Sequence, residues 1–236
     1  YDNISRPGVE LNLRWLWERY GERVQIMAQD VRNPFSLREA VRRAEQVFHF
    51  AAQVAVTTSL KKPMDDFEIN LRGTLNLLEA MRALTHPPPL VFTSTNKVYG
   101  ALEDIPLRTE GSRVEPVDPT LRRKGVAEDR PLDLHSPYGC SKGAADQYVL
   151  DYTRVFSLPC AVFRMSCIYG PHQFGTEDQG WIAHFIIRTL ADGPLTLYGD
   201  GKQVRDVLFV EDLLNAFQAA RKHIDRISGQ AFNIGG

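Results

Sequence analysis

The sequence has few cysteines and no histidine pattern typical of a metal site. Its three cysteines, Cys140, Cys160 and Cys167, are odd in number and contain no C-x-x-C pair, so they predict neither a disulfide framework nor a zinc site. The six histidines lack the spacing of known ligand motifs such as H-E-x-x-H. We therefore predict no bound metal and reduced, mostly packed thiols.

Long apolar runs and an excess of charge are also lacking. No stretch approaches the roughly 20 apolar residues of a membrane helix, and the chain does not start with a charged and then apolar signal peptide. The formal net charge of -1 and the pI near 6.7 create no field that would attract nucleic acid or an anionic membrane. These features predict a cytoplasmic protein with neither a nucleic acid nor a membrane as its partner.

The 236 residues, of which 43% are hydrophobic, are enough for one large domain with a buried core. Short apolar runs of strand length alternate with longer segments of helical period. This order predicts a parallel sheet covered on both faces, an α/β doubly wound fold of the Rossmann type. The predicted strands are residues 24–28, 47–50, 90–93, 160–164, 195–198, 207–210 and 231–234, and the predicted helices are residues 8–20, 36–44, 63–84, 137–156, 181–191 and 211–222.

The beginning of the chain resembles the last residues of a strand already under way. No Gly-x-x-Gly-x-x-Gly turn occurs anywhere, so the first strand and the phosphate-binding turn of such a fold are not expected in this chain. Together with an end that coincides with a strand, this suggests an interior piece of a longer protein. We predict an N-terminally incomplete dinucleotide-binding domain over residues 1–165. Residues 166–236 are predicted to form part of a small substrate-binding domain, C-terminally incomplete, together with elements that return to the sheet.

Three stretches do not follow the alternating pattern. Residues 102–136 are rich in proline and charge and lead directly to Tyr138, so we interpret them as a flap on the substrate side rather than as disorder. Residues 170–180 and 199–206 contain glycines and polar side chains, and both are suited to approach a ligand.

The most informative segment is Ser136-Pro137-Tyr138-Gly139-Cys140-Ser141-Lys142. A helix that begins near Pro137 would place Tyr138 and Lys142 on one face, one turn apart. The ammonium would then favour the phenolate and lower the pKa of Tyr138, so that the phenol could act as a general base. Spacing alone is weak evidence, because Tyr198 and Lys202 repeat it within a glycine-rich turn. An ordinary surface pair is the alternative reading of Tyr138 and Lys142.

Longer stretches resemble the extended short-chain dehydrogenase/reductase family, namely its nucleotide-sugar epimerases and dehydratases. Within it, the likeness is greatest to epimerases that act at carbon 2 of a CDP-linked 3,6-dideoxyhexose. The similar stretches span essentially the whole chain: residues 2–6, 53–59, 66–70, 94–100, 135–147, 178–181 and 201–207.

The resemblance implies a catalytic triad and NAD as the cofactor. Thr95 would hydrogen-bond the reacting sugar hydroxyl, Tyr138 would remove its proton, and Lys142 would hold the phenolate and the nicotinamide ribose. Asp2 would bind the adenosine ribose, which favours NAD over its 2'-phosphate form. The implied cofactor-binding residues are Asp2, Asn3, Ser5, Arg6, Asp30, Val31, Ala51, Ala52, Gln53, Asn70, Thr93, Tyr138, Lys142 and Arg164.

The same resemblance implies a nucleotide-sugar substrate, with a CDP-sugar favoured over other bases. Family dehydratases carry an acidic pair after the catalytic threonine, whereas this chain has Asn96 and Lys97, which disfavours dehydration. Common 4-epimerases have asparagine where Cys167 stands. The implied substrate-binding residues are Thr95, Asn96, Lys97, Cys167, Gln173, Gln179 and Arg205, the last as a diphosphate ligand.

Two other functions stay open at this point. One is a 4-epimerase or a net reductase acting on a similar sugar, and the other is a non-catalytic dinucleotide-binding module without the glycine-rich turn. The helices that begin at Pro63 and Pro137 resemble those of a family dimer seam, although their apolar stripes also suit an internal core. A homodimer or a higher homo-oligomer is the predicted assembly.

Overall fold

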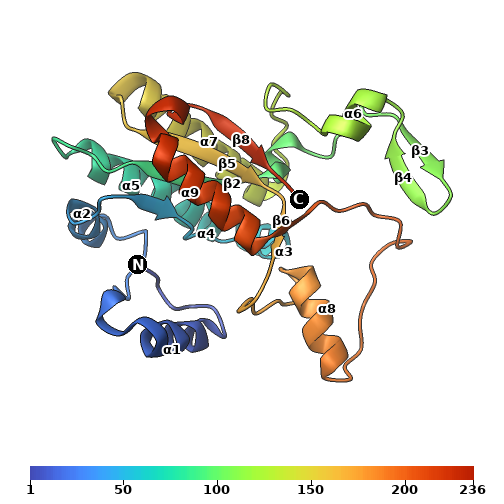
Figure 1. Cartoon of the computed structure of the whole chain (residues 1–236), viewed down its shortest axis with the longest axis horizontal. Coiled ribbons are helices and arrows are strands. Elements are labelled where there is room, and N and C mark those ends of the chain that lie inside the picture. The colour runs from blue at the N-terminus through green and yellow to red at the C-terminus, as the bar shows by residue number, and fades with distance from the viewer.

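A four-stranded parallel sheet forms the centre of the molecule (Figure 1), described here for residues 1–236 from a computed structural model. Each register is parallel, for example Val91 beside Ala161 and Phe163 beside Phe232. The strands, in spatial order, are β1 (Val47–His49), β2 (Leu90–Thr95), β5 (Cys160–Met165) and β8 (Ala231–Ile234).

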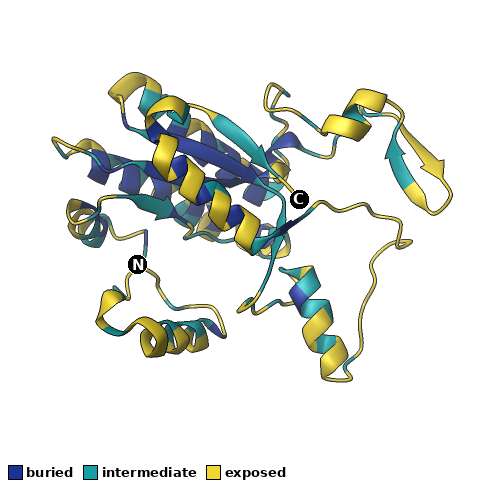
Figure 2. Cartoon of the chain, in the orientation of Figure 1, coloured by how far each residue is buried: buried dark blue, intermediate teal, exposed yellow.

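Helices cover both faces of this sheet, which confirms the predicted doubly wound α/β fold (Figures 1 and 2). On one face, Leu78, Met81 and Val149 pack against Leu90 and Phe92 of β2. On the other face, Phe217 of α9 packs against Phe163. The covering helices are α2 (Pro34–Arg42), α5 (Gly73–Arg82) and α7 (Ser136–Phe156) on the first face and α9 (Val210–Ile227) on the second.

The helical segment that packs beside α7 contains an irregular turn. The run from Pro63 to Arg82 is α-helical at both ends, but its middle segment is a π-helix. Such wide turns are rare and occur often at functional sites. The three parts are α4 (Pro63–Asp66), η2 (Phe67–Arg72) and α5.

Two predicted strands are wrong. Residues 24–28 make one isolated bridge, between Asp2 and Ala28, because the chain places no further backbone beside them. Residues 195–198 are exposed and irregular, since they cross from α8 (Trp181–Leu190) to β7 (Val207–Phe209) without a partner. Strand β7 instead pairs with β6 (Cys167–Tyr169), a strand that the sequence did not predict.

Residues 102–136 form an arm that the sequence predicted as a flap without regular structure. The arm contains a hairpin of β3 (Leu107–Glu110) and β4 (Arg113–Pro116), followed by α6 (Pro119–Lys124). Glu115 joins these elements, because its carboxylate accepts hydrogen bonds from Arg108 and Arg122. The hairpin and α6 extend away from the sheet on the side opposite α1 (Val9–Tyr20) (Figure 1).

The remaining elements are short. The sequence did not predict α3, whose first turn follows Ala55. The remaining short elements are η1 (Gly21–Arg23), α3 (Val56–Lys61) and η3 (Asn96–Tyr99). None of the helices has both the length and the apolar character needed to cross a membrane.

Candidate active site

A cavity of about 780 Å³ lies between the first residues of the chain, α2 and the loop after β1. Its wall includes most of the residues that the sequence assigned to the cofactor. Those that line it are Asp2, Asn3, Ser5, Arg6, Asp30, Val31, Ala51, Ala52 and Gln53.

Polar acceptors are gathered at the N-terminal end of this cavity. The Asp2 carboxylate accepts a hydrogen bond of 2.6 Å from the N–H of Ile4, and the Asn3 side-chain oxygen accepts one of 2.8 Å from Ser5 Oγ. Asp2 and Asn3 are both exposed and both line the cavity. This donor and acceptor set fits the hydroxyls of a nucleoside, which is the part of NAD expected there.

Asp30 is held by a residue that sequence reasoning missed. The Arg32 guanidinium binds the Asp30 carboxylate in a bidentate manner, with hydrogen bonds of 2.9 and 2.8 Å, and the Asn3 side chain donates a third bond of 3.0 Å. The hydrogen bonds from Arg32 hold the pKa of Asp30 well below its usual range. Arg32 could have been found from its place two residues after Asp30, a spacing that allows a local side-chain contact.

Asn70 is a buried hub inside the π-helical segment. Its amide oxygen accepts a hydrogen bond of 2.8 Å from the N–H of Gln53, and its amide nitrogen donates to Gln53 O at 3.0 Å and to Ser141 Oγ at 3.0 Å. Asn70 therefore links the Gln53 backbone in the cavity wall to Ser141 of α7. Because it does not line the cavity, its contribution to cofactor binding would be indirect.

The first turn of α7 carries the predicted base. Pro137 stands at the start of the helix, and Tyr138 and Lys142 follow one turn apart. Their exposed fractions are only 8% and 4%. Thr95, at the carboxyl end of β2, lies close enough to Tyr138 to lower the pKa of its phenol. The structure thus brings the three predicted catalytic residues to one place.

The predicted effect of Lys142 on the phenol differs from the structure. Burial raises the pKa of Tyr138, the nearby Thr95 side chain lowers it, and the charges of Asp66 and Cys167 raise it further. Lys142 does not contribute, because its ammonium donates instead to the carbonyl of Thr93 at 2.5 Å. The prediction of a lowered pKa for this phenol was therefore wrong for this arrangement.

Lys142 itself has an unusual environment. Its Nζ lies 4.4 Å from the centre of the Phe92 ring and contacts no carboxylate. Burial lowers the pKa of Lys142 to about 8, although the charges of Asp146 and Asp66 oppose this change. Thr93 holds the ammonium through its backbone, since its hydroxyl donates to the carbonyl of His49 at 2.6 Å. Thr93 is therefore placed to support Lys142 rather than to bind a cofactor with its side chain.

Arg164 does not line the large cavity and forms a buried ion pair instead. Its guanidinium donates to both oxygens of Asp146, at 2.9 and 3.0 Å, and to the phenol of Tyr99 at 2.9 Å. Both members of the pair are buried, at 5% and 0% exposure of the side chain. Three of its N–H groups are therefore engaged inside the protein, and its assignment to cofactor binding stays a prediction.

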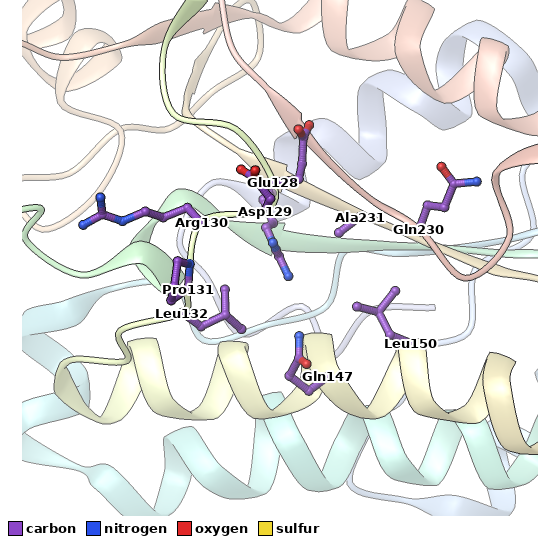
Figure 3. Close-up of a pocket in the computed structure, with 10 residues that line it drawn as sticks. Glu128, Asp129, Arg130, Pro131, Leu132, Gln147, Leu150, Gln230 and Ala231 are labelled. Carbon is purple, nitrogen blue, oxygen red and sulfur yellow. The ribbon is translucent and has the colours of Figure 1, made fainter. Parts of the chain in front are cut away.

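Arg164 borders a second hollow of about 530 Å³, which lies apart from the predicted triad (Figure 3). Gln147 and Leu150 reach it from α7, and Gln230 and Ala231 lie at the beginning of β8. The arm closes one side with residues 128–132. Apart from Arg164, none of the predicted site residues lines this hollow.

The predicted substrate residues lie around the end of β2 and along two loops. Asn96 and Lys97 follow Thr95 in η3 and are both exposed. The N–H of Cys167 donates to the carbonyl of Asp206, which places Arg205 beside the start of β6. The Arg205 side chain is exposed and has no acidic partner.

Residues 170–180 connect this region to the cavity. Gln173 donates to the carbonyl of Ile168 at 3.2 Å while its own amide oxygen is buried without a partner, and Gln179 lines the cavity. The loop also contacts α1, where Asn12 donates to the carbonyl of His172. At Gly8, a Cβ atom would come within 2.4 Å of the Phe174 ring, so this contact requires glycine.

The comparisons with known proteins agree with this geometry. The family model described as "NAD dependent epimerase/dehydratase family" matches residues 12–235. The chain is 45% identical to the CDP-paratose 2-epimerase of Salmonella typhi over 243 aligned residues, which cover all of this chain and 70% of that protein. It spans about half the length of other curated relatives that it matches, which include UDP-glucose 4-epimerases and dTDP-glucose 4,6-dehydratases.

Solved structures show the same fold. The UDP-glucose 4-epimerase of Thermus thermophilus, in complex with NAD, is 33% identical, with a TM-score of 0.74 over 92% of this chain and 65% of that one. The UDP-glucose 4-epimerase of Thermotoga maritima, solved with UDP-glucose, is 27% identical, with a TM-score of 0.78 over 99% and 67%. With a match over nearly all of its length, the chain belongs to the NAD dependent epimerase/dehydratase family.

Proposed function

We propose that this protein is an NAD-dependent epimerase of a nucleotide-linked sugar, most specifically one that inverts carbon 2 of CDP-paratose to give CDP-tyvelose. The observation that carries the proposal is the cluster at the start of α7, where Tyr138 is buried against Thr95 and Lys142 lies one turn along. The 45% identity with a CDP-paratose 2-epimerase supports the choice of substrate.

In the proposed reaction, Thr95 orients the sugar hydroxyl and Tyr138 removes its proton. Bound NAD supplies an acceptor and donor of hydride that no side chain can replace. Lys142, whose buried ammonium donates to the carbonyl of Thr93 one turn along α7 from Tyr138, would hold the nicotinamide ribose. Oxidation makes the sugar carbon planar, so return of the hydrogen to the opposite face inverts the hydroxyl without net redox change.

The residues after Thr95 favour epimerisation over dehydration. Elimination of water requires an acid and a base beside the sugar, and relatives of this chain include dTDP-glucose 4,6-dehydratases. Here the two following residues are Asn96 and Lys97, which provide neither carboxyl group. Both are exposed at the end of β2, where they can contact a sugar or its diphosphate without acting as that pair.

The nucleotide part is assigned to two groups of residues. The N-terminal acceptors and the wall of the large cavity would hold the nucleoside of NAD, and the exposed Arg205 would bind the diphosphate of the sugar nucleotide as a fork. Cys167, at the start of β6, is near enough to Tyr138 to raise the pKa of the phenol and would lie beside the reacting sugar. A homodimer or higher homo-oligomer remains a prediction.

The deciding experiment incubates the full-length protein with NAD and a panel of CDP-, UDP- and dTDP-linked sugars in deuterated water. Proton NMR then identifies the inverted carbon. We expect inversion at carbon 2 of CDP-paratose with no deuterium at that carbon, because the hydrogen is transferred as hydride and does not exchange with solvent. Inversion at carbon 4 alone would reject the proposed substrate, and deuterium at the inverted carbon would reject the hydride mechanism.

A further inference from the structure

Asp66 is a fully buried carboxylate that contacts no cation. Its side chain is 0% exposed, and the residue closes α4 immediately before the π-helical segment. Three neutral groups donate to it: Gln53 Nε2 at 2.5 Å, Asn70 Nδ2 at 3.3 Å, and the hydroxyl of Ser141. Burial of a charge is costly unless it is fully hydrogen-bonded, so this arrangement needs a reason beyond packing.

Each of the three donors leads to a different part of the site. Gln53 lines the large cavity, and its side-chain oxygen also accepts a hydrogen bond of 2.6 Å from the N–H of Ala55. Asn70 holds the backbone of Gln53 from the other side. Ser141 belongs to the first turns of α7, and its oxygen lies 3.1 Å from the carbonyl of Tyr138. One carboxylate therefore joins the cavity wall to the helix that carries the predicted base.

We propose that Asp66 is a positioning residue, which ties the first turns of α7, and with them Tyr138 and Lys142, to the Gln53 loop on the cofactor side. This inference rests on the function proposed above. Sequence reasoning did not find Asp66, because an acidic residue near the start of a helix is usually a solvated contributor to the helix dipole. Its neighbour Asp65 has that ordinary role, with 53% of its side chain exposed.

The charge of Asp66 also acts on the two groups that it positions. Around the phenol, the titratable groups are Asp66 of α4, Cys167 of β6 and, on the same helix, Lys142. The negative charges raise the pKa of Tyr138. Around the Lys142 ammonium, the titratable groups are Asp66, Asp146 and His49. The two carboxylates oppose the lowering of the Lys142 pKa by burial, and His49 stays neutral. The nearest lysines of α3 and α4, Lys61 and Lys62, are exposed and do not compensate Asp66.

The test compares Asp66→Asn with Asp65→Asn, which removes the same charge one residue earlier at the surface. Tyrosines labelled with 13C at Cζ report their own ionisation by NMR, and Tyr138→Phe identifies the signal among the eight tyrosines. We expect Asp66→Asn to lower the ionisation pH of Tyr138 by about 0.5 to 1 unit, because a like charge is lost in a weakly screened place. Asp65→Asn should leave it unchanged.

Turnover provides the second measurement. Misplacement of the reacting groups should reduce kcat of Asp66→Asn by about tenfold to a hundredfold with little change in KM. Ser141→Ala breaks the link but keeps the charge, so kcat should fall while the phenol titrates as in the wild type. If Asp66→Asn does not fold, Ser141→Ala decides: a lower kcat with an unchanged KM supports the proposal.

The inference is overturned if Asp66→Asn matches Asp65→Asn in both titration and kcat, or if Ser141→Ala keeps the full kcat. The NMR titration needs no turnover. Absence of epimerase activity in the wild type would therefore reject the proposed function, whereas an unshifted phenol in an active Asp66→Asn variant would reject only the electrostatic role of Asp66.

Discussion

Two neighbouring turns of α7 carry buried charges that have opposite kinds of partner. Asp146 faces Arg164, and two parallel hydrogen bonds neutralise both groups. Lys142, one turn earlier, has only the carbonyl of Thr93 and the face of Phe92. A fully paired buried charge contributes to structure, whereas an uncompensated one shifts its pKa and is typical of functional sites. This difference supports the proposed catalytic role for the beginning of α7 and a structural role for its middle.

The largest effect should come from Tyr138→Phe. Loss of the phenolic proton acceptor should reduce kcat by about 10³-fold to 10⁴-fold, while the melting temperature changes little, because the ring keeps its packing. Steady-state kinetics and thermal unfolding check both parts. The matched control is Tyr198→Phe, which alters the second Tyr-x-x-x-Lys interval at a tyrosine that is 68% exposed. Equal activity losses in the two variants would remove the distinction between them.

For the middle of α7 we expect a loss of stability with little loss of activity. Arg164→Met should reduce the free energy of unfolding by about 3 to 5 kcal/mol, because it leaves Asp146 buried without its cation. Urea unfolding measures this loss, and kcat per folded molecule should stay close to that of the wild type. Adding Asp146→Leu to this variant should restore much of the stability. A large loss of kcat in the folded Arg164→Met variant would indicate that Arg164 contributes to activity.

The smallest effect concerns pH and Lys142. Its pKa falls from 10.5 in the unfolded chain to about 8 in the folded protein, so the unfolded state binds more protons between these values and stability rises with pH there. Each unit of this difference corresponds to about 1.4 kcal/mol. Urea unfolding from pH 7.5 to 10.5 should show a rise in the wild type that is missing in Lys142→Met. Parallel curves for the two proteins would contradict the burial of a titrating ammonium.

The sheet and the placing of Tyr138 and Lys142 one helical turn apart could be predicted because both depend on local patterns. Alternating apolar runs place β2 and α7 in sequence, and the interval from Tyr138 to Lys142 defines a shared helical face. The carboxyl end of β2 brings Thr95 to the same edge of the sheet. In each case, neighbours in the sequence determine the geometry.

The parts that were missed depend on contacts between distant segments. No local signal shows that Asp146 will face Arg164 rather than leave it free, so the sequence did not predict this ion pair. The hairpin of the arm is held by Glu115 with Arg108 and Arg122, which in the sequence read only as mixed charge. Residues 24–28 make only an isolated bridge, between Asp2 and Ala28, because an apolar run of strand length forms a strand only where a neighbouring strand pairs with it.

The wide turn at Phe67–Arg72 fixes the length of the helix that contains it. Asp66 precedes this turn and Asn70 lies within it, and both hydrogen-bond Ser141 of α7, while Leu78 and Met81 beyond the turn pack against the sheet. Deletion of one residue here would convert the turn to regular α-helix and rotate everything after it by about 100° about the helix axis. Either Asp66 and Asn70 would no longer contact α7, or Leu78 and Met81 would no longer contact the sheet. Homologous proteins that keep both contacts must therefore also keep the number of residues between them.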